Sequence, residues 1–236
     1  MDKYQLSERD ICTKFITPAI QQAGWQQHQF REEVNLTDGR VMVRGKLAAR
    51  VKNPDAKGGP KRADFVLYAR PNVPIAVVEA KQAKFSVGHG MQQALAYAEM
   101  LDAPFAISSN GDGFLIHDRT GITQPVEREH QISEFPSLDE LWPLYQQWKG
   151  LAAPEAVKLI EQPFYTDGSG KEPRYYQRVA INRAVEAIAK DQQRVLLVMA
   201  TGTGKTYTAF QIIWRMWKAK AKKRILFLAD RNILVD

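Results

Sequence analysis

An apolar run that leads into a glycine-rich loop limits most strongly how this chain can fold. The run covers residues 195–199, the loop reads ATGTGKT over residues 200–206, and a helical pattern continues to residue 218. A strand, a glycine-bearing turn and a helix N-terminus present backbone N–H groups and the positive end of a helix dipole to phosphates. The pattern predicts a nucleotide site, with Lys205 reaching the β- and γ-phosphates and the Thr206 hydroxyl binding Mg²⁺.

The sequence around this loop predicts the start of a parallel α/β sheet. Residues 225–229 form a second apolar run, and near-continuous apolar strands are typical of parallel sheets, whose two faces are both covered. A helical pattern precedes the loop over residues 176–190. We therefore expect 195–199 and 225–229 to be buried strands.

The first half of the chain contains a predicted β-hairpin with charged residues at one end. Two apolar runs, 63–68 and 75–80, are joined by a short loop with two prolines. If the hairpin is centred on Pro71-Asn72, Asp64 lies opposite Glu79. Side chains alternate along a strand, so Glu79 and Lys81 lie on one face.

These charges form a candidate metal site. Two carboxylates on paired strands can bind Mg²⁺, and a neighbouring lysine can orient a water and neutralise charge on a phosphate. The alternative is a cross-strand salt bridge near the sheet edge. Glu79 ends a buried apolar strand, where a charge needs a partner or a metal. Gln93 and Tyr97 follow on a predicted helix and share a face.

Further elements and three chain segments are predicted around these sites. Helical patterns cover 6–23, 86–101 and 138–148, and strands are expected at 41–51, 105–109 and 114–118. In the first helix, Ser7 or Asp10 is the expected N-cap, Pro18 a kink and Gly24 the end. Turn-rich sequence around 150–154 and 165–173 divides the chain into a domain over 1–150, a linker over 151–173 and a second domain beginning at 174.

The distribution of charge points to an anionic partner. Residues 1–150 carry 18 Lys/Arg and 18 Asp/Glu, so the net charge of +7 arises from the 15 basic and 8 acidic residues of 151–236. Within the first half, one acid, Asp55, lies among eight basic residues: Arg40, Arg44, Lys46, Arg50, Lys52, Lys57, Lys61 and Arg62. Clustered Lys and Arg neutralise phosphates, so nucleic acid is the expected partner. The alternative is a solvated hairpin.

The composition also limits the compartment. Cys12 is the only cysteine, which fits a reducing cytoplasm. The N-terminus lacks the basic and apolar regions of a signal peptide, and no apolar run approaches the length of a membrane span. We expect a cytoplasmic protein with no membrane partner.

The motifs of both halves resemble known families. Asp64 with Glu79-Ala80-Lys81 resembles the PD-(D/E)xK nuclease pattern, and the Gln93/Tyr97 pair is similar to an extension in its RecB-like branch. The loop at 200–206 resembles that of superfamily 2 helicases and translocases, with Met199 where the strict pattern has glycine. The sequence around Gln177 resembles their adenine-reading element.

The order of these motifs resembles the N-terminal part of the R subunit of type I restriction–modification enzymes. The resemblance implies a PD-(D/E)xK endonuclease domain over 1–150 and the beginning of a RecA-like motor lobe over 174–236. It further implies Mg²⁺-dependent cleavage of unmodified double-stranded DNA, coupled to ATP-driven translocation. Methyltransferase (M) and specificity (S) subunits are the implied partners. We expect this length of chain, without the remaining motor motifs, to lack ATPase activity.

The resemblance also assigns roles to residues. Asp64 and Glu79 would bind Mg²⁺, with Glu8 a weaker candidate. The implied catalytic set is Asp64, Glu79, Lys81, Gln93 and Tyr97. The implied nucleotide-binding set is Gln177, Thr201, Gly202, Thr203, Gly204, Lys205 and Thr206, with ATP and Mg²⁺ as ligands.

Two other functions are compatible with the same residues. One is a different helicase–nuclease fusion that acts in DNA repair. The other is a catalytically inactive nuclease fold that serves as a DNA-binding or assembly module.

Overall fold

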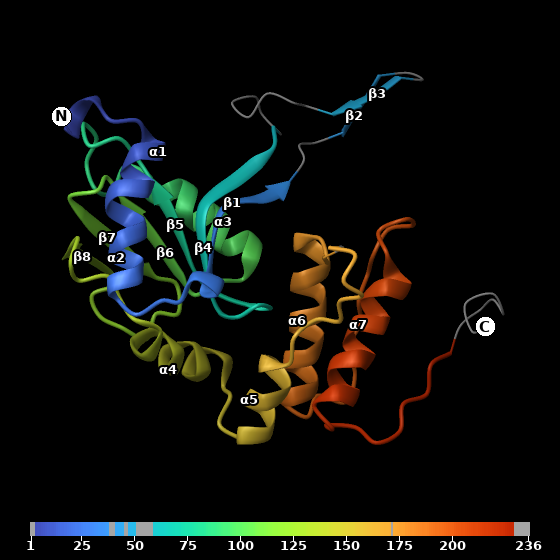
Figure 1. The fold of residues 1–236 in the computed structure, drawn as a ribbon. Coiled ribbons are helices and arrows are strands. Elements are labelled where there is room, and N and C mark those ends of the chain that lie inside the picture. The colour runs from blue at the N-terminus through green and yellow to red at the C-terminus, as the bar shows by residue number, and fades with distance from the viewer. Residues whose placement is uncertain (1–2, 38–40, 45–46, 51–58, 171, 229–236) are drawn as a thin grey trace.

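A six-stranded mixed sheet forms the centre of the molecule (Figure 1). The computed structural model describes residues 3–37, 41–44, 47–50, 59–170 and 172–228. Only β5 and β6 run parallel, and the other neighbouring strands are antiparallel. The strand order is β1 (Phe30–Thr37), β4 (Lys61–Arg70), β5 (Val73–Ala80), β6 (Phe105–Ser109), β7 (Gly113–Asp118) and β8 (Glu127–Gln131). The prediction of a mixed α/β sheet flanked by helices is confirmed. The charged edge strand β8 was not predicted.

Helices cover both faces of this sheet. The N-terminal helices α1 (Glu8–Ile11) and α2 (Thr17–Gln22) and the later α4 (Leu138–Lys149) pack against one face. Helix α3 (Met91–Leu101) packs against the other face. It begins five residues later than predicted, because residues 86–90 form turns.

The N-terminal helix changes its winding partway along. The Ser7 hydroxyl accepts a hydrogen bond from the backbone N–H of Asp10, which confirms Ser7 as the N-cap. A π-helical turn, η2 (Cys12–Ile16), separates α1 from α2. Pro18 is the second residue of α2, directly after this π turn, and the backbone stays helical across the junction. The winding of the helix therefore changes next to Pro18, where the sequence predicts a kink.

The β4–β5 hairpin has the predicted register from Phe65 to Leu67 and again at Arg70. Phe65 pairs with Val78, and Leu67 pairs with Ala76, as a turn centred on Pro71-Asn72 requires. The register shifts locally at Pro74, which cannot donate a ladder hydrogen bond. Continuing the pairing by one residue places Asp64 opposite Glu79.

Three helices pack together beside the β4–β5 turn. They are α5 (Pro154–Glu161), α6 (Tyr175–Ala189) and α7 (Lys205–Lys218), and Figure 1 shows them beside the sheet. Helix α5 lies inside the segment expected to be a linker. It buries Ala156, Leu159 and Ile160 in the same core as the sheet, so this segment is a packed connection.

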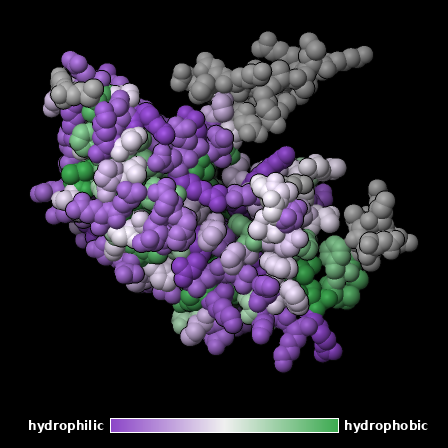
Figure 2. Space-filling view, viewed as in Figure 1, coloured by the Kyte–Doolittle hydropathy of each residue, from purple (hydrophilic) through white to green (hydrophobic). Residues whose placement is uncertain are grey.

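The two predicted strands that flank the glycine-rich loop are not strands here. Residues 195–199 and 225–228 have no regular structure, and Leu196 and Val198 are 86% and 88% exposed. The prediction of buried strands is wrong because no other strand in the described part of the chain pairs with them. Figure 2 shows the apolar surface that results beside α7.

The basic stretch between residues 40 and 62 is only partly described. Residues 41–51, predicted as one strand, instead contain the hairpin of β2 (Val41–Arg44) and β3 (Leu47–Arg50). Of the eight basic side chains, those of Lys61 and Arg62 are described. The other six lie outside the described part: Arg40, Arg44, Lys46, Arg50, Lys52 and Lys57. Among the described helices, none is long and apolar enough to cross a membrane.

Candidate functional site

Strands β4 and β5 bring Asp64, Glu79 and Lys81 to one corner of the sheet. Asp64 shares a sheet face with Val66, and Glu79 with Val77, and both valines pack in the core beneath α3. The Asp64 carboxylate accepts a hydrogen bond of 2.7 Å from the backbone N–H of Ala80. The Lys81 ammonium donates to Glu79 Oε1 at 2.9 Å. The three predicted residues therefore converge on the same side of the sheet.

Helix α3 adds the remaining two predicted residues. Gln93 Oε1 lies 3.4 Å from Lys81 Nζ, and Gln93 Nε2 donates to the Tyr97 hydroxyl at 3.1 Å. Gln93 and Tyr97 are one helical turn apart, so they share the face that meets the strand ends. Glu8, at the start of α1, lies 3.9 Å from Lys81 Nζ. A hydrogen-bonded series thus runs from Glu79 through Lys81 and Gln93 to Tyr97.

Burial dominates the electrostatics of Glu79. This residue is 2% exposed. Burial, followed by repulsion from Asp64, raises the pKa of Glu79 to about 8, although the hydrogen bond from Lys81 opposes the shift. Near neutral pH this carboxyl group therefore takes up a proton readily when no metal ion adds to the charge compensation from Lys81.

The other two charged groups respond to the same environment. Burial raises the pKa of Asp64, and the hydrogen bond from Ala80 reduces this rise. Burial by itself would lower the pKa of Lys81, but the hydrogen bond to Glu79 and the surrounding carboxylates raise it above its usual value. Lys81 is therefore a charged ammonium group, suited to attracting an anion or orienting a water.

The donor set fits a magnesium ion. Glu79 Oε2 is buried and has no hydrogen-bond partner within the described structure. A cation between Glu79 and Asp64 would satisfy this oxygen and remove their repulsion. Mg²⁺ binds through one or two carboxylates and retains several waters, so two carboxylates are sufficient. A cavity of about 160 Å³ lies on the side of Asp64 that faces Glu8 and Arg62, and neither Glu79 nor Lys81 lines it. Within the described residues there is no cluster of three or more potential ligands.

A glycine and a serine that the sequence analysis missed support Glu79. A Cβ atom on Gly90 would lie 3.0 Å from Glu79 Cγ and 3.0 Å from Ser108 Oγ, so a larger residue here would require these side chains to move by a few tenths of an ångström. Ser108 accepts a hydrogen bond from the Gly90 N–H and donates to the carbonyl of Val87. These contacts join segments far apart in sequence, and no local pattern indicates them.

The glycine-rich loop has the backbone form expected of an anion site. Gly202 and Gly204 adopt φ angles of 78° and 85°, which L side chains rarely adopt. Helix α7 begins at Lys205, and its N-terminus therefore faces the loop. Lys205 Nζ donates to the carbonyl of Met199 at 3.2 Å, and Thr201 and Thr206 are exposed. The loop is open to solvent and accessible to a ligand.

Gln177 binds the loop backbone. Its side-chain amide donates to the carbonyl of Thr203 at 2.8 Å and accepts from the N–H of Arg174 at 2.9 Å. The Tyr176 hydroxyl also donates to the Thr203 carbonyl, at 3.4 Å. Gln177 is buried, so it supports the loop instead of projecting from it in this structure.

Comparisons with known proteins match both halves of the chain. Residues 11–136 match the family model of the type I restriction enzyme R protein N terminus. Residues 170–236 match the model of the type III restriction enzyme res subunit.

Two relatives and one solved structure cover nearly the whole chain. The chain is 55% identical over 233 residues to the type I restriction enzyme EcoAI endonuclease subunit of Escherichia coli, covering 98% of this chain and 28% of that protein. It is 28% identical to the EcoKI endonuclease subunit of Escherichia coli strain K12, covering 97% of this chain and 23% of that protein. A solved fragment assigned as an HsdR subunit of a type I restriction enzyme from Vibrio vulnificus YJ016 superposes with a TM-score of 0.77 at 40% identity, covering 91% of this chain and 39% of the other.

Proposed function

This chain belongs to the family of type I restriction enzyme R proteins, and we propose that residues 1–150 are its Mg²⁺-dependent endonuclease domain, of the PD-(D/E)xK kind. Residues 174–236 then begin a RecA-like lobe of a superfamily 2 motor, joined by residues 151–173. The chain spans 28% of the length of the EcoAI subunit, so the translocation and restriction proposed here belong to the longer protein.

The convergence of Asp64, Glu79 and Lys81 at one sheet corner is the observation that carries this proposal. In an arrangement of structural salt bridges, each buried oxygen would have a partner, whereas Glu79 Oε2 has none in the described structure. A buried carboxylate whose pKa is raised to about 8 is typical of a functional site.

The residues divide the proposed chemistry among them. Asp64 and Glu79 would bind Mg²⁺, which supplies charge stabilisation at the scissile phosphate and a more acidic water. Lys81 would orient the attacking water and neutralise negative charge that develops on the phosphate. Gln93 lies within reach of Lys81 and donates to Tyr97, so it fixes the direction of the ammonium group. Because Glu79 is buried, little solvent competes for its carboxylate.

In the proposed motor segment, the exposed loop residues would bind the phosphates of ATP. Lys205 would exchange its bond to the Met199 carbonyl for the β- and γ-phosphates, and Thr206 would bind the accompanying Mg²⁺. Gly202 and Gly204 would allow the loop backbone N–H groups, including those of Thr201 and Thr203, to turn toward the ligand. The proposed partners are unmodified double-stranded DNA and the M and S subunits, in the cytoplasm.

Lys81→Ala in the complete restriction complex tests the nuclease assignment. We expect DNA cleavage to fall by about 10²–10³-fold, while DNA-stimulated ATP hydrolysis is unchanged, because Lys81 lies in the nuclease corner. Lys84→Ala is the matched control, since Lys84 is an exposed lysine on the same loop and pairs with none of the described carboxylates. Undiminished cleavage by Lys81→Ala would show that this corner is a DNA-binding or assembly element instead of a catalytic site.

A further inference from the structure

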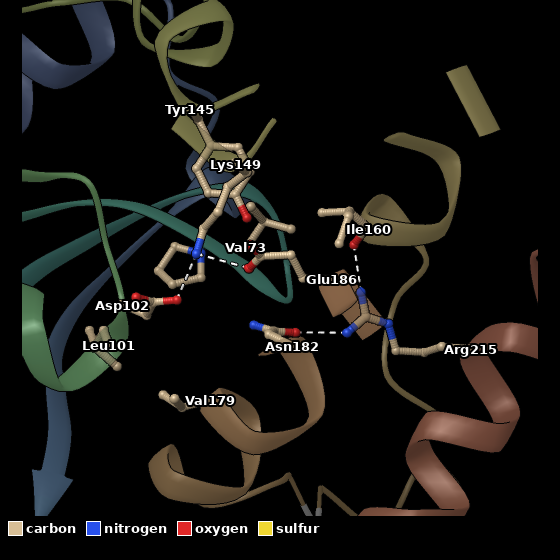
Figure 3. Close-up of a pocket in the computed structure, with 11 residues that line it drawn as sticks. Val73, Leu101, Asp102, Tyr145, Lys149, Ile160, Val179, Asn182, Glu186 and Arg215 are labelled. Atoms are coloured by element: carbon tan, nitrogen blue, oxygen red, sulfur yellow. Dashed lines mark hydrogen bonds and ion pairs between the residues drawn. The ribbon is translucent and has the colours of Figure 1, made fainter. Parts of the chain in front are cut away.

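A set of buried and half-buried polar side chains joins the sheet to helices α6 and α7. We call it the polar joint, and it contains Asn72, Asp102, Lys149, Asn182, Glu186 and Arg215. Its members come from the β4–β5 turn, the end of α3, the end of α4, and the two helices that adjoin the glycine-rich loop (Figure 3). None of these residues is needed for the chemistry proposed above.

The first arm of the polar joint starts at the tip of the β4–β5 hairpin. The Asn182 side chain donates to the backbone carbonyl of Asn72 at 2.7 Å, and its Oδ1 accepts from Arg215 Nη1 at 2.7 Å. The Asn72 side chain donates to the carbonyl of Ile160 at 2.9 Å, which also accepts from Arg215. The turn opposite the nuclease corner is therefore bonded to α5 and α6, and through them to α7.

Arg215 is an unusual component of this arm. It is 0% exposed, and no carboxylate of the described chain pairs with it. Burial lowers the pKa of Arg215 to about 10. A buried guanidinium bonded only to neutral oxygens stabilises a fold poorly compared with apolar residues, but it fixes the geometry of those oxygens closely. The arrangement is therefore suited to keeping α7 in register with the hairpin.

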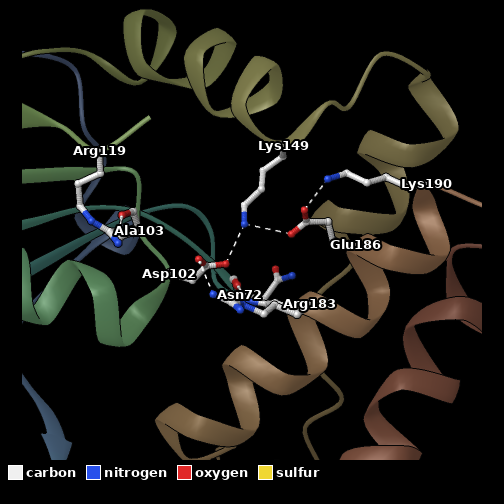
Figure 4. A network of polar contacts seen from close by, with 9 residues as sticks. Asn72, Asp102, Ala103, Arg119, Lys149, Arg183, Glu186 and Lys190 are labelled. Carbon is white, nitrogen blue, oxygen red and sulfur yellow. Dashed lines mark hydrogen bonds and ion pairs between the residues drawn. The ribbon is translucent and has the colours of Figure 1, made fainter. Parts of the chain in front are cut away.

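The second arm links helix α3 to helix α6 (Figure 4). Lys149 lies between Asp102, at 2.7 Å, and Glu186, at 3.0 Å, and Arg183 also reaches Asp102 at 3.2 Å. Asp102 ends α3 in a left-handed conformation, and the same helix carries Gln93 and Tyr97. Both elements that build the nuclease corner are thus attached to α6.

The opposite ends of α6 and α7 contact the glycine-rich loop. Gln177, in the first turn of α6, donates to the Thr203 carbonyl, and α7 begins at Lys205. A phosphate bound at this loop would engage its backbone N–H groups, and the Thr203 carbonyl that Gln177 contacts belongs to the same short segment. An α-helix is stiff along its axis, and each helix spans the short distance from the loop to the polar joint.

We propose that nucleotide binding at residues 201–206 changes the positions of α6 and α7. The polar joint transmits this change to the β4–β5 hairpin, and the hairpin transmits it to Asp64 and Glu79. This coupling rests on the proposed nucleotide site. The coupling is reciprocal: if nucleotide binding changes the conformation of the hairpin, a change in the conformation of the hairpin alters the affinity for the nucleotide.

Hydrogen–deuterium exchange on the whole chain tests this coupling. Exchange is compared with no addition, with Mg²⁺ alone, and with Mg²⁺ and the non-hydrolysable ATP analogue AMP-PNP. We expect the nucleotide to slow exchange in peptides covering the loop and the start of α7, and to change exchange at least threefold in the β5 peptide beyond the effect of Mg²⁺ alone. The loop peptide reports nucleotide binding, and the β5 peptide reports coupling.

Asn182→Asp isolates the polar joint. The carboxylate retains an acceptor for Arg215, so the buried guanidinium stays paired, but it cannot donate to the Asn72 carbonyl. We expect the loop response to remain and the β5 response to fall at least twofold. Gln193→Ala is the matched control, because Gln193 is an exposed amide beyond α6 that bonds to the Asp191 carbonyl. Lys149→Met interrupts the second arm and gives the same readout if Asn182→Asp does not fold.

The outcomes separate the coupling from the nucleotide site. A loop response without a β5 response in the unaltered chain overturns the coupling and leaves the nucleotide site intact. Equal β5 responses in the unaltered chain and in Asn182→Asp also overturn the coupling. If neither peptide responds, both the nucleotide site and the coupling are wrong.

Discussion

The proposed nuclease corner, formed by Asp64, Glu79 and Lys81, and the glycine-rich loop both have residues suited to phosphate chemistry, but they reach their form by different routes. At the corner, side chains from three elements converge, and Glu79 is 2% exposed. At the loop, the backbone of one short segment forms the site, while Leu196 before it is 86% exposed. The corner depends on paired strands and a helix packed across them. The loop depends on two glycines and a helix start, which need no paired strand.

Glu79→Gln gives the largest expected difference between the two regions. In the complete restriction complex we expect DNA cleavage to fall by about 10²–10³-fold, because a neutral amide is a poor Mg²⁺ ligand, while ATP hydrolysis is unchanged. Glu99→Gln, an exposed carboxylate on α3, is the control. Normal cleavage by Glu79→Gln would remove Glu79 from the metal site.

The pH dependence of stability provides a second test of the corner. The pKa of Glu79 in the folded chain, about 8, lies above its ordinary value of 4.5, so folding favours the protonated carboxyl. This contribution to the free energy of unfolding is complete below pH 4.5 and is lost as the pH rises through about 8. Without metal, the slope from Glu79 can reach about 1.4 kcal/mol per pH unit.

Urea unfolding between pH 5 and 9 measures this slope. Because other groups also titrate, the informative quantity is the difference between the unaltered chain and Glu79→Gln, which lacks the ionisable group. Mg²⁺ should reduce the difference, since it favours the charged carboxylate. Parallel pH profiles for the two chains would contradict the assigned pKa of Glu79.

Gly204→Ala tests whether the conformation of the glycine-rich loop matters for nucleotide binding. A Cβ atom there would lie 2.5 Å from Gln177 Nε2, at a φ angle of 85° that alanine adopts with strain. We expect the affinity for Mg·AMP-PNP to fall about tenfold, equivalent to ~1.4 kcal/mol, by isothermal titration calorimetry. Gly168→Ala is a control with a similar φ angle and open space around it. Equal affinities for Gly204→Ala and Gly168→Ala would show that the close packing of Gln177 on the loop does not matter for binding.

Leu196→Ala is expected to have the smallest effect. Because Leu196 is exposed, the free energy of unfolding should change by less than about 0.5 kcal/mol. Leu67→Ala, the same substitution in the sheet core, should cost about 2–5 kcal/mol. A cost for Leu196→Ala comparable to that of Leu67→Ala in urea unfolding would mean that residues 195–199 are buried in solution.

The candidate site could be predicted where short-range geometry determines it. The turn at Pro71-Asn72 and the two-residue alternation of strands place Asp64 across from Glu79, and helical spacing brings Gln93 to Tyr97. Glycines flanked by an apolar run and a helix likewise predict the loop. Gly90 and Ser108 could not be found this way, because their role depends on a contact between segments distant in sequence.

By itself, the sequence determined the hairpin register, the residues at the corner and the form of the loop, because each follows from the repeat of a strand, helix or turn. Only the tertiary structure decided that Glu79 is buried with its own Oε2 unpartnered in the described structure, that residues 195–199 lack a strand partner in the described chain, and that Asn182 bonds both to the hairpin and to Arg215. Burial and pairing depend on which distant segments come into contact, and the local sequence around a side chain does not indicate which residue it will contact.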